Sequence, residues 1–406
     1  MKNQKNIFNR FRPNIRYLIW SLISGIALLL VCYFVDNLPY SFLSGPTIGQ
    51  RVEQIKEYFK TTDDNIPEDL LFVNVAYDRQ LVDVYDEFGF RKGNIDITDR
   101  QKLLQLLRKL QKSNYKYIVL DIAFPNDYKS DEDSLLFALI NRMENIVVAK
   151  SERITLADVS LSAKARYSDY STHIAETNFV KYDFIRKGEA SLPYQMYIDL
   201  FGNKIQSFGP FYFFNGKLAN KSVVLRHPVK LWNKFANFES KERAESQFYD
   251  LGADLLELDM DVSKMADNKI VVIGDFTEND IHDTYLGKIS GPVINVNGFY
   301  ALKNDNLSLP YWYILFLIGL YTITTYCIIA KIDILKHFTL FQKIKFVTVR
   351  YIISTLGLTT LFTVVAILVY WIFSLECNVL IPSIYFSFLL GLIKYRSFKR
   401  TNYSKL

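Results

Sequence analysis

YIVLDIAFPNDYKSDEDSLLFALINR, residues Tyr117–Arg142, is the stretch that decides the fold. Its first residues, Tyr117–Leu120, form a short apolar run rich in β-branched side chains, which is typical of a strand buried on both faces of a parallel sheet. Asp121 stands where this strand ends, and Pro125 stops further sheet pairing. The stretch therefore opens with a predicted central strand that ends in a carboxylate.

A helix and a second strand follow. Ser130 is the predicted helix cap, and Asp131–Asp133 place negative charge in the first turn, where the helix dipole favours it. Apolar residues then recur at helical spacing: Leu135, Leu136, Leu139 and Ile140. Ile146–Ala149 is the next predicted strand, so the whole stretch is one β-α-β unit with a right-handed crossover.

Other parts of the region 36–309 repeat this alternation of strands and helices. Leu70–Val75 and Lys269–Asp275 are predicted buried strands, and a leucine-rich helix to Lys112 follows a cap at Thr98 or Asp99. Further expectations are helices at Ile48–Lys60, Leu192–Leu200 and Val293–Lys303, turns at Asn94–Asp99 and Gly291-Pro292, and a strand at Ser222–Leu225. The aromatic segment Phe208–Phe214 gives no clear assignment. We predict an α/β domain with a mainly parallel sheet.

Four apolar runs flank this region, and each is long enough to cross a bilayer, which takes roughly 20 residues, although the last run is only marginally so. The predicted order is a cytoplasmic N-terminus (1–16), a transmembrane helix (17–35), an extracytoplasmic domain (36–309), three transmembrane helices (310–330, 346–373 and 379–395) and a cytoplasmic tail (396–406). Lysine and arginine gather in both terminal segments and in the loop after the second run, so the positive-inside rule places both termini in the cytoplasm. A cleaved signal peptide is the alternative for the first run, but Asp36–Pro39 offers no small-residue cleavage site.

Charge and cysteine usage narrow the function classes. The formal net charge is +6, and the basic residues lie beside the apolar runs instead of forming a stripe with interleaved aromatics, which argues against nucleic-acid binding. Cys32, Cys327 and Cys377 lie in or beside the runs, so the external domain is not a disulfide scaffold. Free buried thiols are expected, with a Cys32–Cys377 pair as the alternative.

Carboxylates follow three of the predicted strands. Asp78, Asp121 and Asp275 would gather along the carboxyl edge of the sheet if these strands are parallel neighbours, and open α/β sheets bind ligands at that edge. The functional interpretation is a site for a polar ligand or a cation, of unknown metal. The structural alternative is that each aspartate caps a loop or helix and accepts backbone N–H groups.

A second candidate ligand site combines Asn178 and Arg186, with Asp183 between them. Arg186 could hold an anionic ligand through a bidentate contact, and the alternative is a salt bridge to Asp183. Phe211–Phe214 is a candidate pocket or partner surface, with core packing or contact with the membrane surface as the alternative.

Motifs for catalysis are missing from the sequence. No phosphate-binding loop, nucleophile elbow, H-E-x-x-H or C-x-x-C occurs, and Gly274-Asp275 lacks the other glycines of a dinucleotide fingerprint. His282, near Asp280 and Asp283, is a candidate general base, although a loop histidine is more often solvated. We therefore expect no catalytic residue, no cofactor and no enzyme activity.

Several segments, in this order and with this pattern of apolar runs, resemble the type-two CHASE domain family, the cyclase/histidine-kinase-associated sensory extracellular domains of bacterial receptors. The matching segments are Phe72–Asp78, Tyr117–Asn126, Asp131–Ile140, Asn145–Ala149, Asn178–Arg186, Lys269–Asp275, Asp280 and Gly291–Val293. The resemblance implies an extracytoplasmic sensory module in a bacterial plasma membrane. Typical members continue into a cyclase or kinase after the last span, whereas this sequence stops at Leu406.

Three hypotheses follow. The first is a membrane sensory protein that passes a signal to a separate cytoplasmic signalling protein, and it rests on the resemblance and the topology. The second is an envelope scaffold that binds another envelope protein. The third is an envelope enzyme that uses Asp78, Asp121 and Asp275. The lipid bilayer is the expected partner in every case, and a homodimer is expected by analogy with two-fold receptors.

Overall fold

The computed structural model describes residues 14–38, 48–49, 51–52, 55, 67–126, 130–152, 156, 158–169, 171–172, 179–202, 205–224, 247–277, 279–284, 287–332 and 347–403. The helix expected over Ile48–Lys60 and the cytoplasmic segment 1–16 fall largely outside these residues, as does Leu225.

A parallel sheet forms the centre of the α/β domain, as the sequence predicts. In spatial order its strands are β15 (Phe248–Asp250), β1 (Leu70–Asn74), β16 (Ile270–Gly274), β4 (Tyr117–Asp121), β5 (Ile146–Lys150) and β6 (Ala165–Tyr167). The last residues of β16 and β4, Gly274 and Asp121, lie opposite each other in register. The central β4 and its neighbour β5 confirm the β-α-β unit predicted from Tyr117–Arg142.

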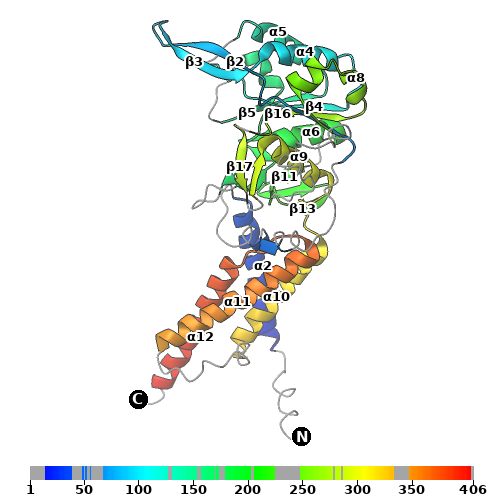
Figure 1. Ribbon diagram of the computed structural model, residues 1–406. Coiled ribbons are helices and arrows are strands. Elements are labelled where there is room, and N and C mark those ends of the chain that lie inside the picture. Colours follow the sequence, from blue (N-terminus) through cyan, green and yellow to red (C-terminus); the bar gives the residue numbers. More distant parts are fainter. Residues whose placement is uncertain are drawn as a thin grey trace.

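Helices cover both faces of this sheet (Figure 1). One face packs on α4 (Arg100–Leu110), α5 (Asp133–Arg142), the π-helical η3 (Leu251–Glu257) and α8 (Val262–Met265); the other packs on α6 (Leu192–Phe201) and α9 (Gly291–Lys303). Alternate strand residues divide between the two cores, with Phe72 and Val119 on the α9 side and Val73 and Leu120 on the α4 side. The sheet is thus apolar on both faces, which explains why its strands are continuous apolar runs in the sequence.

Smaller sheets complete the domain. They comprise the hairpin β2 (Arg79–Tyr85) and β3 (Arg91–Thr98), the pair β9 (Ile185–Arg186) and β10 (Glu189–Ala190), the meander β11 (Ile205–Phe208), β12 (Phe211–Phe214) and β13 (Lys217–Ala219), and the sheet of β7 (Ser171–Thr172), β8 (Phe179–Asp183), β14 (Ser222–Val224), β17 (Ile281–Thr284) and β18 (Gly287–Ser290). A short 3-10 helix, η1, spans Val159–Ala163. The labelled strands β11, β13 and β17 lie between the parallel sheet and the long helices, while the β2–β3 hairpin projects at the opposite end (Figure 1).

Long apolar helices form a separate bundle: α2 (Ile15–Asp36), α10 (Tyr311–Ile329), α11 (Val347–Phe373) and α12 (Leu380–Tyr403) (Figure 1). Of the described helices, α2 and α10 are long and apolar enough to cross a membrane, whereas α11 and α12 contain the shorter apolar stretches Gly357–Phe373 and Leu380–Ile393. Helices α2 and α10 approach closely because Gly25 leaves no side chain at the point where Thr322 packs.

Polar contacts tie α2 to the domain at a set of residues that we call the joint: Tyr33, Asp36, Asn37, Lys181, Ala219, Asn220, Lys221 and Asn378. The Tyr33 hydroxyl donates to the carbonyl of Ala219 at 3.0 Å, and the backbone N–H of Lys221 donates to Asn37 at 2.8 Å. The Lys181 ammonium donates to the carbonyl of Asp36 at 2.9 Å. Since Lys181 is buried, this contact fixes the end of α2 against strand β8.

Some local predictions are wrong, for physical reasons. Helix α5 begins at Asp133 with Glu132, and not the predicted Ser130, at the cap position, because the Asp133 carboxylate accepts the backbone N–H of Ser130 at 3.0 Å and holds that residue in the preceding turn. Leu135, predicted on the apolar face, is 58% exposed. Gly291-Pro292 is the first turn of α9 instead of a separate turn, since proline fits that position without losing a hydrogen bond.

The predicted turn at Asn94–Asp99 is instead the second half of strand β3. The hairpin is mostly exposed, and the alternation of Ile95 and Ile97 with polar residues is only a short strand signal, which the turn prediction missed. Asp99 is the confirmed cap of α4, and its carboxylate accepts from the backbone N–H of Lys102 at 2.9 Å.

Candidate functional site

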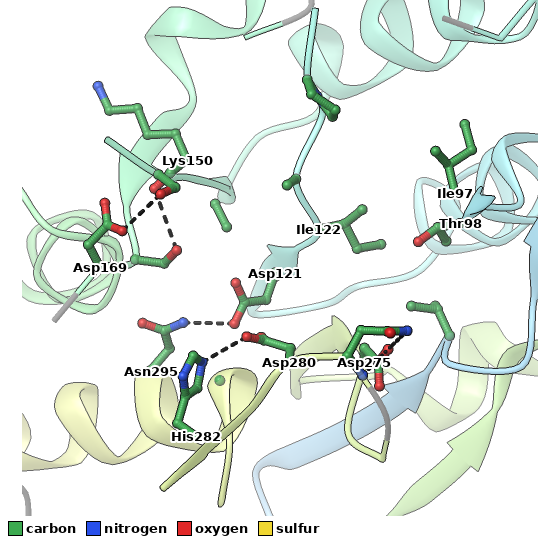
Figure 2. A pocket seen from close by; sticks show the side chains of 18 of the residues that line it. Ile97, Thr98, Asp121, Ile122, Lys150, Asp169, Asp275, Asp280, His282 and Asn295 are labelled. Carbon is green, nitrogen blue, oxygen red and sulfur yellow. Dashed lines mark hydrogen bonds and ion pairs between the residues drawn. The ribbon is translucent and has the colours of Figure 1, made fainter. Parts of the chain in front are cut away.

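A crevice of about 400 Å³ opens at the carboxyl ends of β1, β16, β4 and β5 (Figure 2). The residues that line it at or just after these strand ends include Val75, Asp275, Asp121 and Lys150. Strands β16 and β4 are neighbours, but the chain leaves β4 toward α5 on one face and leaves β16 toward α9 on the other. Such a switch point is where open α/β sheets form their binding crevices.

Asp121 is partly buried and lies at the centre of the crevice (Figure 2). The amide of Asn295, on α9, donates to its carboxyl at 2.7 Å, and the hydroxyl of Tyr182 donates to the Asn295 carbonyl oxygen at 2.8 Å. Burial, with a smaller contribution from the nearby Asp280, raises the pKa of Asp121 to about 8, although the hydrogen bond from Asn295 acts to lower it. Asp121 is therefore a carboxyl that holds its proton near neutral pH.

Asp280 and His282 complete this cluster, and Figure 2 shows both side chains turned toward Asp121. The imidazole Nε2 of His282 lies 2.8 Å from Asp280 Oδ1. Gly291 allows this arrangement, since a Cβ at that position would collide with the Asp280 carboxylate. The glycine of the predicted Gly291-Pro292 turn is thus required for the close approach of helix α9 to the site.

Asp275 lines the same crevice but serves mainly to hold its own loop. Its carboxylate pairs with Arg79 at 2.6 Å and accepts the backbone N–H groups of Thr277 and Asn279, each at 3.1 Å. This is the loop-capping role that the sequence left open as the structural alternative.

Asp78 points elsewhere. It is buried, pairs with Lys102 at 2.6 Å and accepts the backbone N–H of Gly252 at 2.9 Å, so it caps the start of η3 and does not line the crevice. The structure therefore brings together two of the three strand-end aspartates. Within the described residues, no group of three His, Cys, Asp or Glu side chains is arranged to hold a metal ion.

The second candidate site is only partly covered, because Asn178 lies outside the described residues. Arg186 does not line the crevice, and its Nε pairs with Glu152 at 2.7 Å in place of the predicted partner Asp183. The aromatic Phe211–Phe214 forms strand β12 of the meander, where Phe214 is fully buried.

Arg100 is a site residue that the sequence does not reveal. It is only 2% exposed, lines the crevice, lies 3.4 Å from Asp133 and stacks over the Phe124 ring at 4.3 Å. Burial lowers the pKa of Arg100 to about 10, which Asp133 opposes. Its Nε and Nη1 atoms have no hydrogen-bond acceptor among the described residues, although its Nε is near Asp133. The only sequence signal is an arginine directly after the cap Asp99.

Comparison with protein families gives one match. The model of a family described as the CHASE2 domain matches residues 50–328, which is more than half of the chain and extends from before β1 into α10. Comparison with curated proteins and with solved structures gives no match.

Proposed function

The chain belongs to the CHASE2 family of extracellular sensory domains, and from this premise we propose that it is an integral membrane sensory protein of a bacterial plasma membrane. Its crevice binds a signal, and the membrane helices pass the resulting change to a separate cytoplasmic partner. The sensory role is supported by the family assignment. The cytoplasmic partner and the direction of signalling are supported by the contacts between the crevice and α2 that are described below.

The observation that carries the proposal is a route of hydrogen bonds from the crevice to α2 that passes through two adjacent residues of strand β8. Asp121 accepts from Asn295, and Asn295 accepts from Tyr182 on strand β8. The adjacent residue of that strand, Lys181, donates to the carbonyl of Asp36 at the end of α2. A ligand that displaces Asn295 would thus disturb the strand that holds the joint.

The other two strand-end carboxylates, Asp275 and Asp78, argue against catalysis. Asp275 and Asp78 are each engaged by a basic side chain and by backbone N–H groups, so neither is placed as a free acid or base. We assign no reaction and no cofactor to the crevice.

The proposed topology has four spans, with both termini in the cytoplasm and the α/β domain outside. The apolar lengths of α2 and α10 support two spans, and the apolar stretches of α11 and α12 support the other two. Fusion of a fluorescent reporter that folds only in the cytoplasm tests this. We expect fluorescence after residue 403 and none after residue 152; fluorescence at the second position contradicts the topology.

Chemical cross-linking in native membranes tests the function. We expect the tagged full-length chain to capture a cytoplasmic signalling protein that an unrelated tagged four-span protein does not capture. Recovery of envelope proteins alone would overturn the sensory proposal and favour the scaffold alternative.

One observation favours that alternative. Four apolar side chains of the β2–β3 hairpin are 58–76% exposed, and they are Leu81, Tyr85, Phe88 and Phe90. An exposed apolar group at the end away from the membrane suits contact with another envelope protein. Replacing Phe88 and Phe90 by serine should remove envelope cross-links, while Phe208→Ser, at an exposed residue of β11, should not; unchanged cross-links argue against a scaffold.

A further inference from the structure

The crevice has an acidic pole, which we define as Asp121 and Asp280. Both lie within it, and their mutual repulsion contributes to the raised pKa of Asp121. His282 approaches Asp280, and Asn295 donates one hydrogen bond to Asp121. Two carboxyl groups with these two neighbours still favour a further positive charge between them.

Arg100 forms a basic pole in the same crevice. A guanidinium has five N–H donors, and buried donors are almost always satisfied in proteins. Here Nε and Nη1 lack an acceptor among the described residues, and the one ion-pair contact, to Asp133, is a long 3.4 Å. Two other basic residues that line the crevice are already paired, Arg79 with Asp275 and Lys150 with Glu189. Among the described residues that line the crevice, Arg100 is thus a cation with spare donors, and a planar carboxylate matches the paired N–H donors of its guanidinium best.

Apolar side chains also line the crevice: Val75, Ile97, Ile122 and Ile294. Figure 2 shows Ile97 on the opposite side of the crevice from His282 and Asn295, with Ile122 between. A volume of about 400 Å³ is at the lower end of small-molecule sites, so the crevice suits a small ligand with a short apolar body.

We propose that the crevice binds a small amino-carboxylate zwitterion, with its carboxylate on Arg100 and its ammonium between Asp121 and Asp280. The proposal rests on the sensory function above and specifies the ligand class. A dianion would meet the acidic pole, and a dication would leave the spare donors of Arg100 unmatched. A molecule with one charge of each sign satisfies both poles.

A chain-length series tests this by isothermal titration calorimetry on the full-length protein in nanodiscs at pH 8. The probes are glycine, β-alanine, 4-aminobutanoate and 6-aminohexanoate, with hexanoate and hexylamine as one-charge controls. We expect one length to bind best, and we expect each one-charge control to bind at least about tenfold more weakly, because a lost charged hydrogen bond is worth about 1.5–3 kcal/mol.

Variants locate the two ends of the bound probe. Arg100→Gln should abolish the preference for the amino acid over hexylamine, and Asp121→Asn should abolish its preference over hexanoate. Arg100→Lys is the second variant if Arg100→Gln does not fold. It keeps a positive charge beside Asp133 but removes the paired N–H donors of the guanidinium, so it tests the bidentate contact alone. Arg91→Gln, at an exposed arginine of the hairpin, is the matched control and should bind as the wild type does.

Two results overturn the ligand class. One is the absence of binding by the whole series to folded protein, and the other is equal binding by the one-charge controls. Recovery of a cytoplasmic partner in the cross-linking experiment, together with either result, leaves the sensory function standing and removes only the zwitterion.

Discussion

Asp121→Asn should stabilise the protein near neutral pH, which is unusual for a substitution in a binding crevice. Asparagine has the shape of a protonated aspartic acid, and its carbonyl oxygen can accept the existing 2.7 Å hydrogen bond from Asn295. The substitution thus keeps the packing and removes only the titration of a buried acid.

The magnitude follows from proton linkage. The pKa of Asp121 rises from its ordinary value of 3.8 to about 8 on folding, so between these pH values the folded state holds a proton that the unfolded chain has released. Stability falls as pH rises through this window, by about 1.4 kcal/mol per pH unit, and up to ~4 kcal/mol is lost by pH 7. Because Asp121 is only partly buried and lines the crevice, where solvent screens its charge, we assign about half of this, ~2 kcal/mol, to Asp121.

Thermal unfolding of the full-length chain in detergent, followed from pH 5 to pH 9, measures the effect. We expect the melting temperature of Asp121→Asn to exceed that of the wild type by about 4–8 °C at pH 7, with a gap that widens as pH rises to 8. The control is Asp283→Asn, at an exposed carboxylate of β17, which should follow the wild type. Parallel pH curves for wild type and Asp121→Asn would refute the reasoning, as would a lower melting temperature of the variant at pH 8.

Three further substitutions test the supporting structure. Gly291→Ala forces its Cβ into the Asp280 carboxylate, so it should lower the free energy of unfolding by about 1–3 kcal/mol and weaken ligand binding. The control is Gly319→Ala, which has open space around its Cβ and should unfold at the wild-type temperature or slightly above it. Asp99→Ala removes the cap of α4 and should cost about 1 kcal/mol in thermal unfolding; no loss would mean that the cap is replaced by water. Leu106→Ala opens a cavity in the α4 core and should cost about 2–5 kcal/mol; a loss below 1 kcal/mol would contradict its complete burial.

The parallel sheet could be predicted because its signal is local. Tyr117–Leu120, Ile146–Ala149 and Lys269–Asp275 are short apolar runs, and a run of that kind has few alternatives to a strand buried on both faces. The leucines of α4 gave a second local signal, since a helix that covers a sheet needs one apolar face. Because the predicted strands are parallel, their carboxyl ends meet at one edge of the sheet. This placed Asp121 and Asp275 together, and both line the crevice.

The composition of the site could not be predicted in the same way, because side-chain direction depends on neighbours that are distant in sequence. Asp78 turns away from the crevice because Lys102 and the backbone N–H of Gly252 offer it an ion pair and a hydrogen bond. Arg100 turns inward because Asp133 and the ring of Phe124 receive it. An arginine after a helix cap is ordinarily a solvated surface charge, so nothing in the sequence distinguishes Arg100.

The size of the signal is limited by the contacts that carry it. Along the route from Asp121 through Asn295 and Tyr182, and then from Lys181 to the end of α2, each hydrogen bond contributes about 1 kcal/mol net, and the charge-assisted one from Lys181 contributes more. A ligand that exchanges one or two of them can couple the crevice to α2 by only about 1–3 kcal/mol, which is the usual range for allosteric coupling. Such a coupling shifts an equilibrium between two arrangements of the helices by about 5- to 150-fold, so the bundle must already be close to balance between them. A crevice that binds more tightly cannot exceed this limit, since only the difference in affinity between the two arrangements is transmitted.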